Sequence, residues 1–166
     1  MDFKEINVRD IKENLVKLIC DDWMLISAGN PDSSNTMTAS WGFMGEMWYK
    51  DCAAVVVRPS RHTYKFMEEN EYFSLCFFED EFKDILKFCG SKSGRDVDKI
   101  KETGLTPVYT DNTVYYEQAK IVVICRKMYA SDLDPESFTD KTALDSYGGT
   151  NYHRVYVGEI VKVLAK

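Results

Sequence analysis

Apolar and polar residues follow one another along the chain in short blocks, most of them with the length of a β-strand. Apolar or β-forming runs predict strands at residues 23–28, 36–43, 52–57, 72–78, 114–129 and 152–164. The run over 52–57 is continuously apolar, as expected of a buried strand, whereas residues 152–164 alternate. Residues 36–43 predict either a strand or a strand-like loop.

Helical spacing occurs between these strands. Apolar residues at three- and four-residue steps predict short helices at residues 6–19, 60–67, 81–88, 95–102 and 135–146. Asn7 is the expected N-cap of the first helix and Ser60 that of the second, because their side chains accept hydrogen bonds from free backbone N–H groups. Gly104 is expected to end the fourth helix.

The order of these elements bears on the fold class. Six or more strands with short, irregular helices, and without a regular strand–helix alternation, favour an antiparallel barrel over a doubly wound parallel sheet. The prediction is a mainly β protein with short helices (α+β). We expect residues 1–166 to form one domain, since the 166-residue chain has neither repeats nor a linker-like segment.

Charge and apolar content exclude several classes of protein. Lys and Arg total 21 and Asp and Glu total 27, which gives a net charge of −6. A nucleic-acid groove usually shows a basic excess, so nucleic acid is not an expected partner. No apolar run approaches the roughly 20 residues that span a bilayer, and the first ten residues lack a signal-peptide pattern. We therefore expect a cytoplasmic protein without membrane association.

The cysteines and histidines do not predict a metal site. The five cysteines are odd in number and form no CxxC pair, so small buried thiols in a reducing compartment are expected. His62 and His153 are the only histidines, and neither has a partner three or four residues away. The G-x-S-x-G, G-x-G-x-x-G and P-loop motifs are absent from the sequence as well.

Three segments have a composition that suits ligand binding. Residues 35–42 place small hydroxyl side chains beside Trp41 and Gly42, so that the backbone can approach a flat ligand. Residues 58–63 join an apolar strand to a helix start and contain two arginines, as at many phosphate sites. Residues 90–95 combine glycines, serines and cations, as in an anion-holding loop.

Each segment also has a purely structural interpretation. Residues 35–42 would equally suit an edge strand with surface threonines. Residues 58–63 would suit a capped helix with solvated arginines, and residues 90–95 a flexible surface loop. Composition alone leaves these alternatives open.

Four runs, taken together, resemble one known family. Residues 35–42, 56–63, 93–99 and 153–161 are similar, in this order, to motifs of the flavin reductase-like family, in its flavoredoxin-type branch. The resemblance extends from about residue 23 to residue 163. It implies an FMN-binding split β-barrel that works as a homodimer, with a flavin site at each end of the interface.

The resemblance also implies a set of cofactor-binding residues. The backbone from Thr38 to Trp41 would meet the isoalloxazine edge, and Asn35 would line the flavin. The phosphate would lie among the residues of 58–63, with 92–94 near the phosphate or the ribityl chain and His153 near the flavin. The full set is Asn35, Met37, Thr38, Ala39, Ser40, Trp41, Arg58, Ser60, Arg61, Thr63, Lys92, Ser93, Gly94 and His153.

The function implied by the resemblance is that of an oxidoreductase. FMN would accept a hydride from NAD(P)H, a small-molecule nicotinamide donor, and pass electrons on, with an electron-acceptor protein as one further partner. No catalytic side chain is named, because the flavin supplies the chemistry. Two alternatives stay open: an FMN-binding electron carrier without enzyme activity, and a similar barrel for haem or a pyridoxal-type phosphate.

Overall fold

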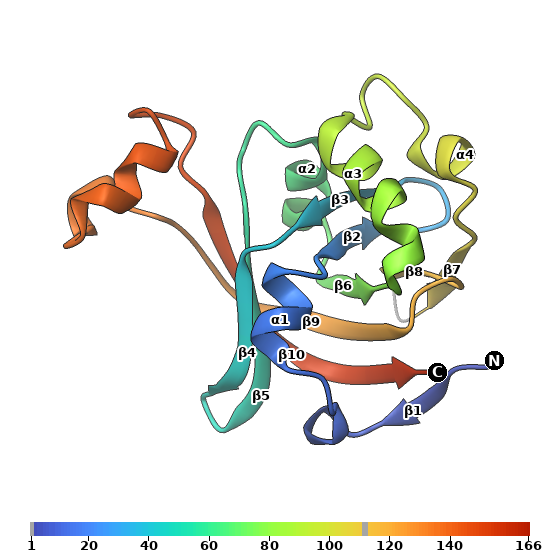
Figure 1. Cartoon of the computed structure of the whole chain (residues 1–166). Coiled ribbons are helices and arrows are strands. Elements are labelled where there is room, and N and C mark those ends of the chain that lie inside the picture. The colour runs from blue at the N-terminus through green and yellow to red at the C-terminus, as the bar shows by residue number, and fades with distance from the viewer. Residues whose placement is uncertain (1, 111–112) are drawn as a thin grey trace.

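The computed structural model describes residues 2–110 and 113–166, and antiparallel strands dominate it (Figure 1). The strands are β1 (Lys4–Ile6), β2 (Met24–Gly29), β3 (Ser34–Ala39), β4 (Gly42–Met47), β5 (Lys50–Val57), β6 (Tyr72–Phe77), β7 (Pro107–Thr110), β8 (Thr113–Tyr116), β9 (Ile121–Asp132) and β10 (Arg154–Ala165). Eight of them form one sheet in the order β3-β2-β6-β9-β10-β5-β4, in which β1 pairs with β10. Strands β7 and β8 form a separate hairpin.

Short helices connect the strands. They are η1 (Val8–Asp10), α1 (Leu15–Cys20), α2 (His62–Glu69), η2 (Asp80–Phe82), α3 (Lys83–Ser91), α4 (Lys99–Thr103), η3 (Pro135–Ser137) and η4 (Lys141–Ser146). Two of them, η3 and η4, lie in a segment that leaves the sheet (Figure 1). Helices α2 and α3 lie on either side of β3, and α1 lies near β4 (Figure 1). The segments from α2 to α3 therefore surround one end of β3.

Both faces of the central strands are buried, in two separate cores. Ile26 and Leu75 point into a core that includes Val55, while their neighbours Leu25 and Cys76 point into a second core against α3 and β8. Side chains alternate between the faces of a strand, so a strand that is covered on both sides is apolar at every position. This explains why residues 52–57 are continuously apolar, and why 23–28 and 72–78 are apolar except at Ser27 and Ser74, whose buried hydroxyls are hydrogen-bonded.

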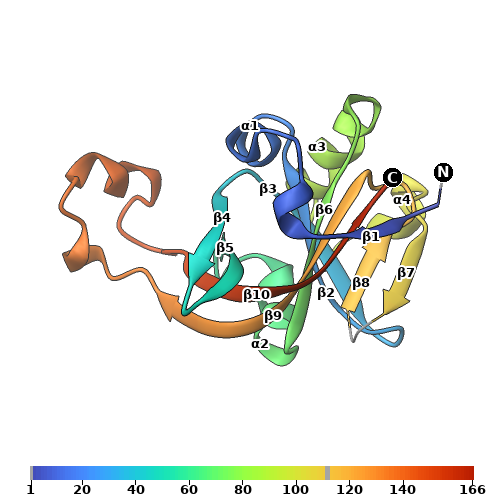
Figure 2. The ribbon, with the colours of Figure 1, turned by 90° about the horizontal axis from the view of Figure 1, so that it is seen from below.

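The sheet curves where β9 and β10 pair. The register between them shifts at Val157/Gly158, which is the irregularity of a β-bulge. A Cβ at Gly158 would lie 2.8 Å from the Phe73 ring and from the Cβ of Cys125, so this close approach requires glycine. Figure 2 shows both strands bending across the molecule at this point. The bend allows one sheet to wrap around the first core.

Two predicted elements were wrong because contacts distant in sequence intervene. Residues 6–19 do not form one helix: Ile6 pairs with Val163 in a sheet, and a separate helix starts after Asn14, whose side chain accepts from Val16 N and Lys17 N. Asn7 caps only η1. Residues 114–129 are interrupted at 117–120, between β8 and β9.

Other boundaries also shift. The run 36–43 divides between β3 and β4, with Ser40 and Trp41 between them, and 135–146 holds two 3₁₀ turns in place of one helix. Helix α2 has Arg61 at its N-cap position without a side-chain cap bond, so the prediction of Ser60 as cap was wrong. Helix α4 is capped by Asp98 and ends at Gly104 (φ +70°), where the end was predicted.

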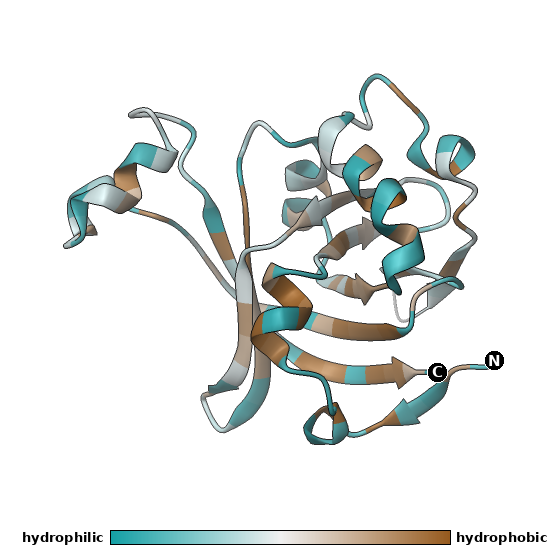
Figure 3. Ribbon diagram, in the orientation of Figure 1, coloured by the Kyte–Doolittle hydropathy of each residue, from teal (hydrophilic) through white to brown (hydrophobic). Residues whose placement is uncertain are grey.

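A long excursion connects β9 to β10. Residues 133–153, named the arm here, leave the sheet and return to it (Figures 1 and 2). Figure 3 shows mostly polar and intermediate residues along the arm, in contrast to the apolar residues of β9 and β10. Tyr147 is the one buried residue among those of the arm, at 8% exposed. Its ring contacts Phe138, Tyr152 and His153 of the arm and the Arg58 guanidinium, so this part of the arm lies next to the site described below.

Candidate functional site

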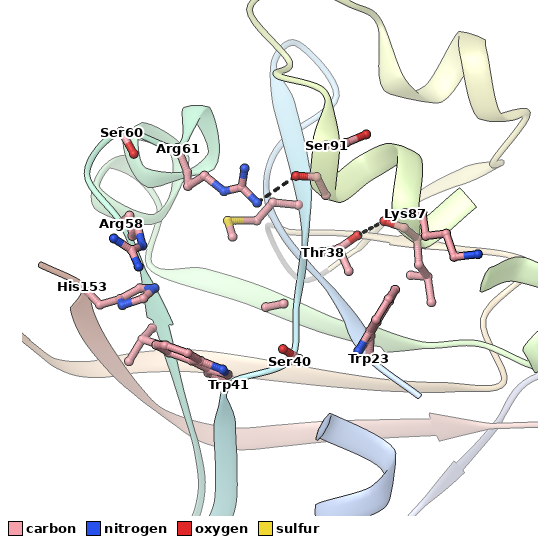
Figure 4. Close-up of a pocket in the computed structure, with 15 residues that line it drawn as sticks. Trp23, Thr38, Ser40, Trp41, Arg58, Ser60, Arg61, Lys87, Ser91 and His153 are labelled. Carbon is pink, nitrogen blue, oxygen red and sulfur yellow. Dashed lines mark hydrogen bonds between the residues drawn. The ribbon is translucent and has the colours of Figure 1, made fainter. Parts of the chain in front are cut away.

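A cavity of about 740 Å³ opens between β3, α3 and the start of α2, and is named the main cavity (Figure 4). It is lined by Trp23, Met37, Thr38, Ala39, Ser40, Trp41, Val56, Arg58, Ser60, Arg61, Leu86, Lys87, Gly90, Ser91 and His153. Ligand cavities in proteins commonly measure about 300–1,000 Å³. The main cavity is therefore large enough for a cofactor-sized molecule.

One wall is the end of β3 and its link to β4. Thr38 Oγ1 donates to the carbonyl of Leu86 in α3, which joins the strand to the helix. A Cβ at Gly90 would lie 3.2 Å from the Cβ of Thr38, so glycine permits the tight packing of α3 on β3. Between the two strands, Ser40 and Trp41 leave the sheet, and Trp41 is 49% exposed. This wall offers backbone groups and one aromatic ring to a ligand.

The guanidinium groups of Arg58 and Arg61 lie opposite this wall (Figure 4). Arg95 lines a separate space and donates to the segment that joins these two residues; Arg58, Arg61 and Arg95 together are named the basic rim. Arg58 Nη2 donates to the Ser146 carbonyl (2.8 Å). Arg61 Nη2 donates to the Gly90 carbonyl (3.0 Å), and Arg95 Nη1 to the Ser60 carbonyl (3.0 Å). Within residues 2–110 and 113–166, none of the three is ion-paired with a carboxylate. The rim therefore keeps its positive charge available for an anion.

His153 faces Trp41 across the mouth of the cavity, with ring centroids 5.1 Å apart. Its Nδ1 lies 2.8 Å from the hydroxyl of Tyr147, and the Arg58 guanidinium lies over the Tyr147 ring at 4.8 Å. Burial lowers the pKa of His153 to about 4, with smaller contributions from Arg58 and Arg61. The imidazole is therefore neutral at pH 7 and serves as a hydrogen-bonding group, not as a charge.

A second, much smaller space adjoins the main cavity through Met37 and Arg61 and is named the small cavity. It is lined by Asn35, Met37, Arg61, His62, Thr63, Lys92, Ser93, Gly94 and Lys99. Asn35 Nδ2 donates to Thr63 Oγ1 (2.8 Å). A Cβ at Gly94 would lie 2.1 Å from Asn35 Oδ1, so the loop can pass this point only with glycine.

The predicted site residues thus separate into two neighbouring groups. Met37, Thr38, Ala39, Ser40, Trp41, Arg58, Ser60, Arg61 and His153 line the main cavity, and Asn35, Thr63, Lys92, Ser93 and Gly94 line the small one. Asn35 and Thr63 are bonded to each other, and Thr63 is 1% exposed. These two side chains brace β3 against α2 and present little surface to a ligand.

Sequence reasoning missed part of the lining. Trp23, Leu86 and Lys87 border the main cavity but lie outside every segment singled out for ligand binding or for the resemblance. Other lining residues lie inside those segments but were not in the predicted set: Val56, His62, Gly90, Ser91 and Lys99. Trp23 carried a signal, since a large aromatic residue stood at the start of an apolar run. Leu86 and Lys87 carried none, because a helix with apolar spacing does not show which side faces a cavity.

Two features are absent from the part of the chain that the structure describes. No group of three or more His, Cys, Asp or Glu side chains could hold a metal ion there. Among the same residues, no helix has both the length and the apolar character needed to cross a membrane.

Comparisons with known proteins bear on the family and the fold of this chain. Residues 17–166 match the flavin reductase like domain. The fold resembles flavoredoxin from Methanosarcina acetivorans (TM-score 0.70, 20% identity, 87% of this chain and 68% of that chain). It also resembles an FMN-binding domain of a flavin reductase-like enzyme from Shewanella baltica (TM-score 0.72, 14% identity, 99% and 77%). A search of curated proteins found no match.

A third similar structure, from Shewanella frigidimarina, is described as having a split barrel domain (TM-score 0.69, 15% identity, 97% of this chain and 75% of that chain). The protein is therefore an antiparallel split barrel, which confirms the predicted fold class. The chain belongs to the flavin reductase like family, because the matched segment covers nearly its whole length.

Proposed function

We propose that this protein binds FMN in the main cavity and is an oxidoreductase that takes electrons from NAD(P)H. The observation that carries the proposal is the basic rim. Arg58 and Arg61 border a cavity of about 740 Å³ without carboxylate partners among the described residues, in a chain with a net charge of −6. Uncompensated guanidinium groups favour a phosphate-bearing ligand.

Different parts of the lining suit the ring system and the phosphate of FMN. Trp41 and the end of β3 offer a flat wall and backbone polar groups to a ring system, and Arg61 borders both cavities where a phosphate would lie. When bound, FMN supplies the redox chemistry, in which its N5 atom accepts a hydride from a nicotinamide. The protein's residues bind and orient the ring system and leave one side of the cavity open for the donor.

His153 would contribute a hydrogen bond without a charge. The Tyr147 hydroxyl is suited to donate to Nδ1, which leaves the proton of the neutral imidazole on Nε2. Nε2–H then faces the cavity as a donor for a carbonyl oxygen of the ligand. The neutral state follows from burial and from the basic rim, which disfavour the imidazolium.

The first test is an absorbance spectrum of the purified protein with FMN, before and after anaerobic addition of NADH or NADPH. A protein-bound flavin band that bleaches with one nucleotide supports the reductase and identifies its donor. Bleaching by dithionite alone would make the protein an electron carrier reduced by another protein. Absence of flavin binding would overturn the proposal.

We also infer that the protein works as a homodimer. On the outer face of the sheet, Phe43, Ala54, Val157 and Tyr129 form one row across β4, β5, β10 and β9 in the register. Ala54 and Val157 are buried, whereas Phe43 (65% exposed) and Tyr129 (49% exposed) at the ends of the row are not. Exposed aromatic side chains of this kind are enriched at interfaces.

Sedimentation equilibrium tests the dimer. The native chain is expected to sediment as a dimer and the Phe43→Lys variant as a monomer. Tyr109→Lys, at an exposed aromatic residue on the separate β7–β8 hairpin, is the matched control and should leave the dimer intact. A native chain that is monomeric at micromolar concentration would contradict the inference.

The cysteines support a proposal about the compartment. Cys52, Cys76, Cys89 and Cys125 are buried free thiols, and burial raises the pKa of Cys76 to about 12. Buried unpaired thiols suit a reducing compartment. We propose that the protein works in the cytoplasm, where NAD(P)H is available as donor.

A further inference from the structure

Trp23 lines the main cavity at the end next to α3, away from the basic rim. Figure 4 shows Ser40 between Trp23 and Trp41, and Arg58 and Arg61 on the opposite side of the cavity. The proposed placement of FMN puts its phosphate near Arg61 and its ring system near Trp41. Trp23 therefore borders the part of the cavity that this placement leaves free for a second ligand.

The backbone of Trp23 is strained. Its φ of +69° lies in the left-handed region, which favours glycine over residues with a Cβ. The turn before it is fixed by neighbouring bonds: the N–H groups of Asp21 and Asp22 both donate to the Lys17 carbonyl, at 2.9 and 3.0 Å. The Asp22 carboxylate also pairs with Lys17 Nζ at 2.6 Å. A tryptophan where glycine would be unstrained indicates that the side chain itself is used.

Lys83, the first residue of α3, covers one face of the Trp23 ring. Its Nζ lies 3.7 Å from the ring centroid, in a cation–π contact. The same ammonium group donates to the carbonyls of Asp21 and Asp22, the latter at 3.2 Å. Among the residues that the structure describes, no carboxylate is ion-paired with it. The positive charge therefore stays directly behind the ring.

The covered face of the ring is turned away from the cavity. The residues that line the main cavity include Trp23 and exclude Lys83. Figure 4 shows the Trp23 ring nearly edge-on, with its other side toward the cavity. Trp23 also packs in part against the second core, which includes Leu86. The ring is thus a fixed flat wall with one open face and a positive charge behind it.

A charge behind the ring changes what can stack on its open face. The face of an indole ring is electron-rich and attracts cations, and the Lys83 charge offsets this attraction. With a stacking distance of about 3.5 Å added to the 3.7 Å on the other side, a stacked cation would lie about 7 Å from Nζ. Among the described residues, no carboxylate lines the main cavity to compensate the repulsion. An uncharged ring stacks without this penalty.

We propose that Trp23 and Lys83 form a specificity-determining wall of the main cavity, on which a flat uncharged ring stacks and a flat cationic ring is disfavoured. The identity of the ligand rests on the proposed function, because the nicotinamide ring is uncharged in NAD(P)H and a pyridinium cation in NAD(P)⁺. The wall then favours the electron donor over the oxidised product. Trp23 makes the contact, and Lys83 acts through Trp23 as a positioning residue.

The first test uses two probes of similar shape and different charge, nicotinamide and the cation 1-methylnicotinamide. The protein is labelled with 5-fluorotryptophan and titrated in the presence of FMN, and tryptophan-to-phenylalanine variants assign the fluorine NMR signals of its three tryptophans. Nicotinamide should shift the Trp23 signal and leave unchanged that of Trp48, in the turn between β4 and β5. The native protein should bind 1-methylnicotinamide more weakly than nicotinamide.

The second test removes the charge behind the ring. Repulsion over about 7 Å, at effective dielectric constants of about 20 to 80, corresponds to about 3–50-fold in affinity. Lys83→Met should therefore strengthen binding of 1-methylnicotinamide by that factor and leave nicotinamide binding nearly unchanged. Lys83→Arg keeps the charge and should discriminate between the probes as the native protein does.

The matched control is Lys166→Met. Lys166 Nζ also lies over an aromatic ring, that of Phe3 at 4.8 Å, but neither residue lines the main cavity. This substitution should change neither affinity. An equal gain in 1-methylnicotinamide affinity in Lys166→Met and Lys83→Met would show that the net charge of the protein, and not the wall, sets the preference.

The outcomes separate this inference from the proposed function. Equal affinities of the native protein for the two probes, an unshifted Trp23 signal, or unchanged discrimination in Lys83→Met would each overturn the wall. FMN binding would be unaffected by these results, so the proposed function would stand. If the protein binds no FMN, the proposed function fails; the expected response of the Trp23 signal to both probes would then still support a wall for uncharged flat rings.

Discussion

The arginines of this protein fall into two groups with different partners. Arg9, Arg126 and Arg154 lie away from the cavities, and each pairs with a carboxylate: Asp51 at 2.6 Å, Glu159 at 2.7 Å and Asp132 at 2.9 Å. Arg58, Arg61 and Arg95 form the basic rim and donate to backbone carbonyls. The chain has more acidic than basic residues, so the lack of partners at the rim does not come from a shortage of carboxylates.

The difference shows what each group is suited to do. A carbonyl orients a guanidinium and leaves its charge intact, whereas a carboxylate neutralises it. The rim is thus prepared for an anion that the chain does not supply. The other three arginines form exposed surface pairs, which contribute little to stability. The predictions below test this division, beginning with the largest expected effect.

Arg61→Met should have the largest effect, because Arg61 borders both cavities. We expect FMN affinity to fall by about 100-fold, the upper range for one lost charged hydrogen bond, with a much smaller change for riboflavin. Titration of flavin fluorescence measures both. Arg126→Met is the matched control outside the site, and equal losses in the two variants would erase the distinction between the groups.

A smaller effect is expected from His153, whose protonated form would add to the charge of the rim. Its pKa is about 4 in the folded protein and about 6.5 when unfolded, so the unfolded chain binds more protons between these values. Stability contributed by the neutral imidazole is therefore present above pH 6.5 and is lost as the pH falls toward 4. The native protein should therefore lose about 1–3 kcal/mol more of its free energy of unfolding between pH 6.5 and pH 4 than the His153→Gln variant does.

Urea unfolding between pH 4 and pH 7 measures the His153 contribution. The pKa of His62 is lowered as well, chiefly by burial, so the native chain and His153→Gln share that part of the profile. Their difference isolates His153. Parallel profiles for the two proteins would show that neither burial nor the basic rim disfavours a charge at this position.

The smallest effect is expected outside the site. Arg126→Gln breaks the pair with Glu159, whose carboxylate has its pKa lowered by hydrogen bonds from Lys50 and Arg126. Exposed pairs contribute about 0–1 kcal/mol, so unfolding in urea should shift by no more than this. FMN affinity should stay unchanged. A tenfold loss of FMN affinity would contradict the assignment of Arg126 to the surface group.

Part of the fold and of the site could be predicted because it depends on residues that are close together in the sequence. Residues 52–57 are apolar throughout and 72–78 are apolar except at Ser74, since both faces of these strands are buried, and this pattern predicts buried strands directly. The sequence also predicted Arg58, Arg61 and Trp41 as site residues, because they belong to short runs that resemble motifs of the family. The helix end at Gly104 was predicted because glycine alone adopts its positive φ without strain.

Other features depend on partners far away in the sequence. Ile6 has helical spacing with its neighbours, yet it pairs with Val163, and the sheet competes successfully with a short helix. Ser60 is a residue type common at helix N-caps, but its hydroxyl accepts a hydrogen bond from Asn151 Nδ2 of the arm at 2.8 Å. Lys99 stands in a charged stretch that looks solvated, and only its packing against α3 and β3 shows that it is buried.

The sequence by itself determined the strand-rich class of the protein, its family and the residue types that gather at the site. Hydrophobic periodicity and short motifs depend only on neighbouring residues, so they can be recognised without the structure. Only the tertiary structure decided which charges go unpaired. Whether an arginine or a lysine meets a carboxylate or a carbonyl depends on how segments distant in sequence pack together. In this protein, that pairing separates the cations of the site from those of the surface.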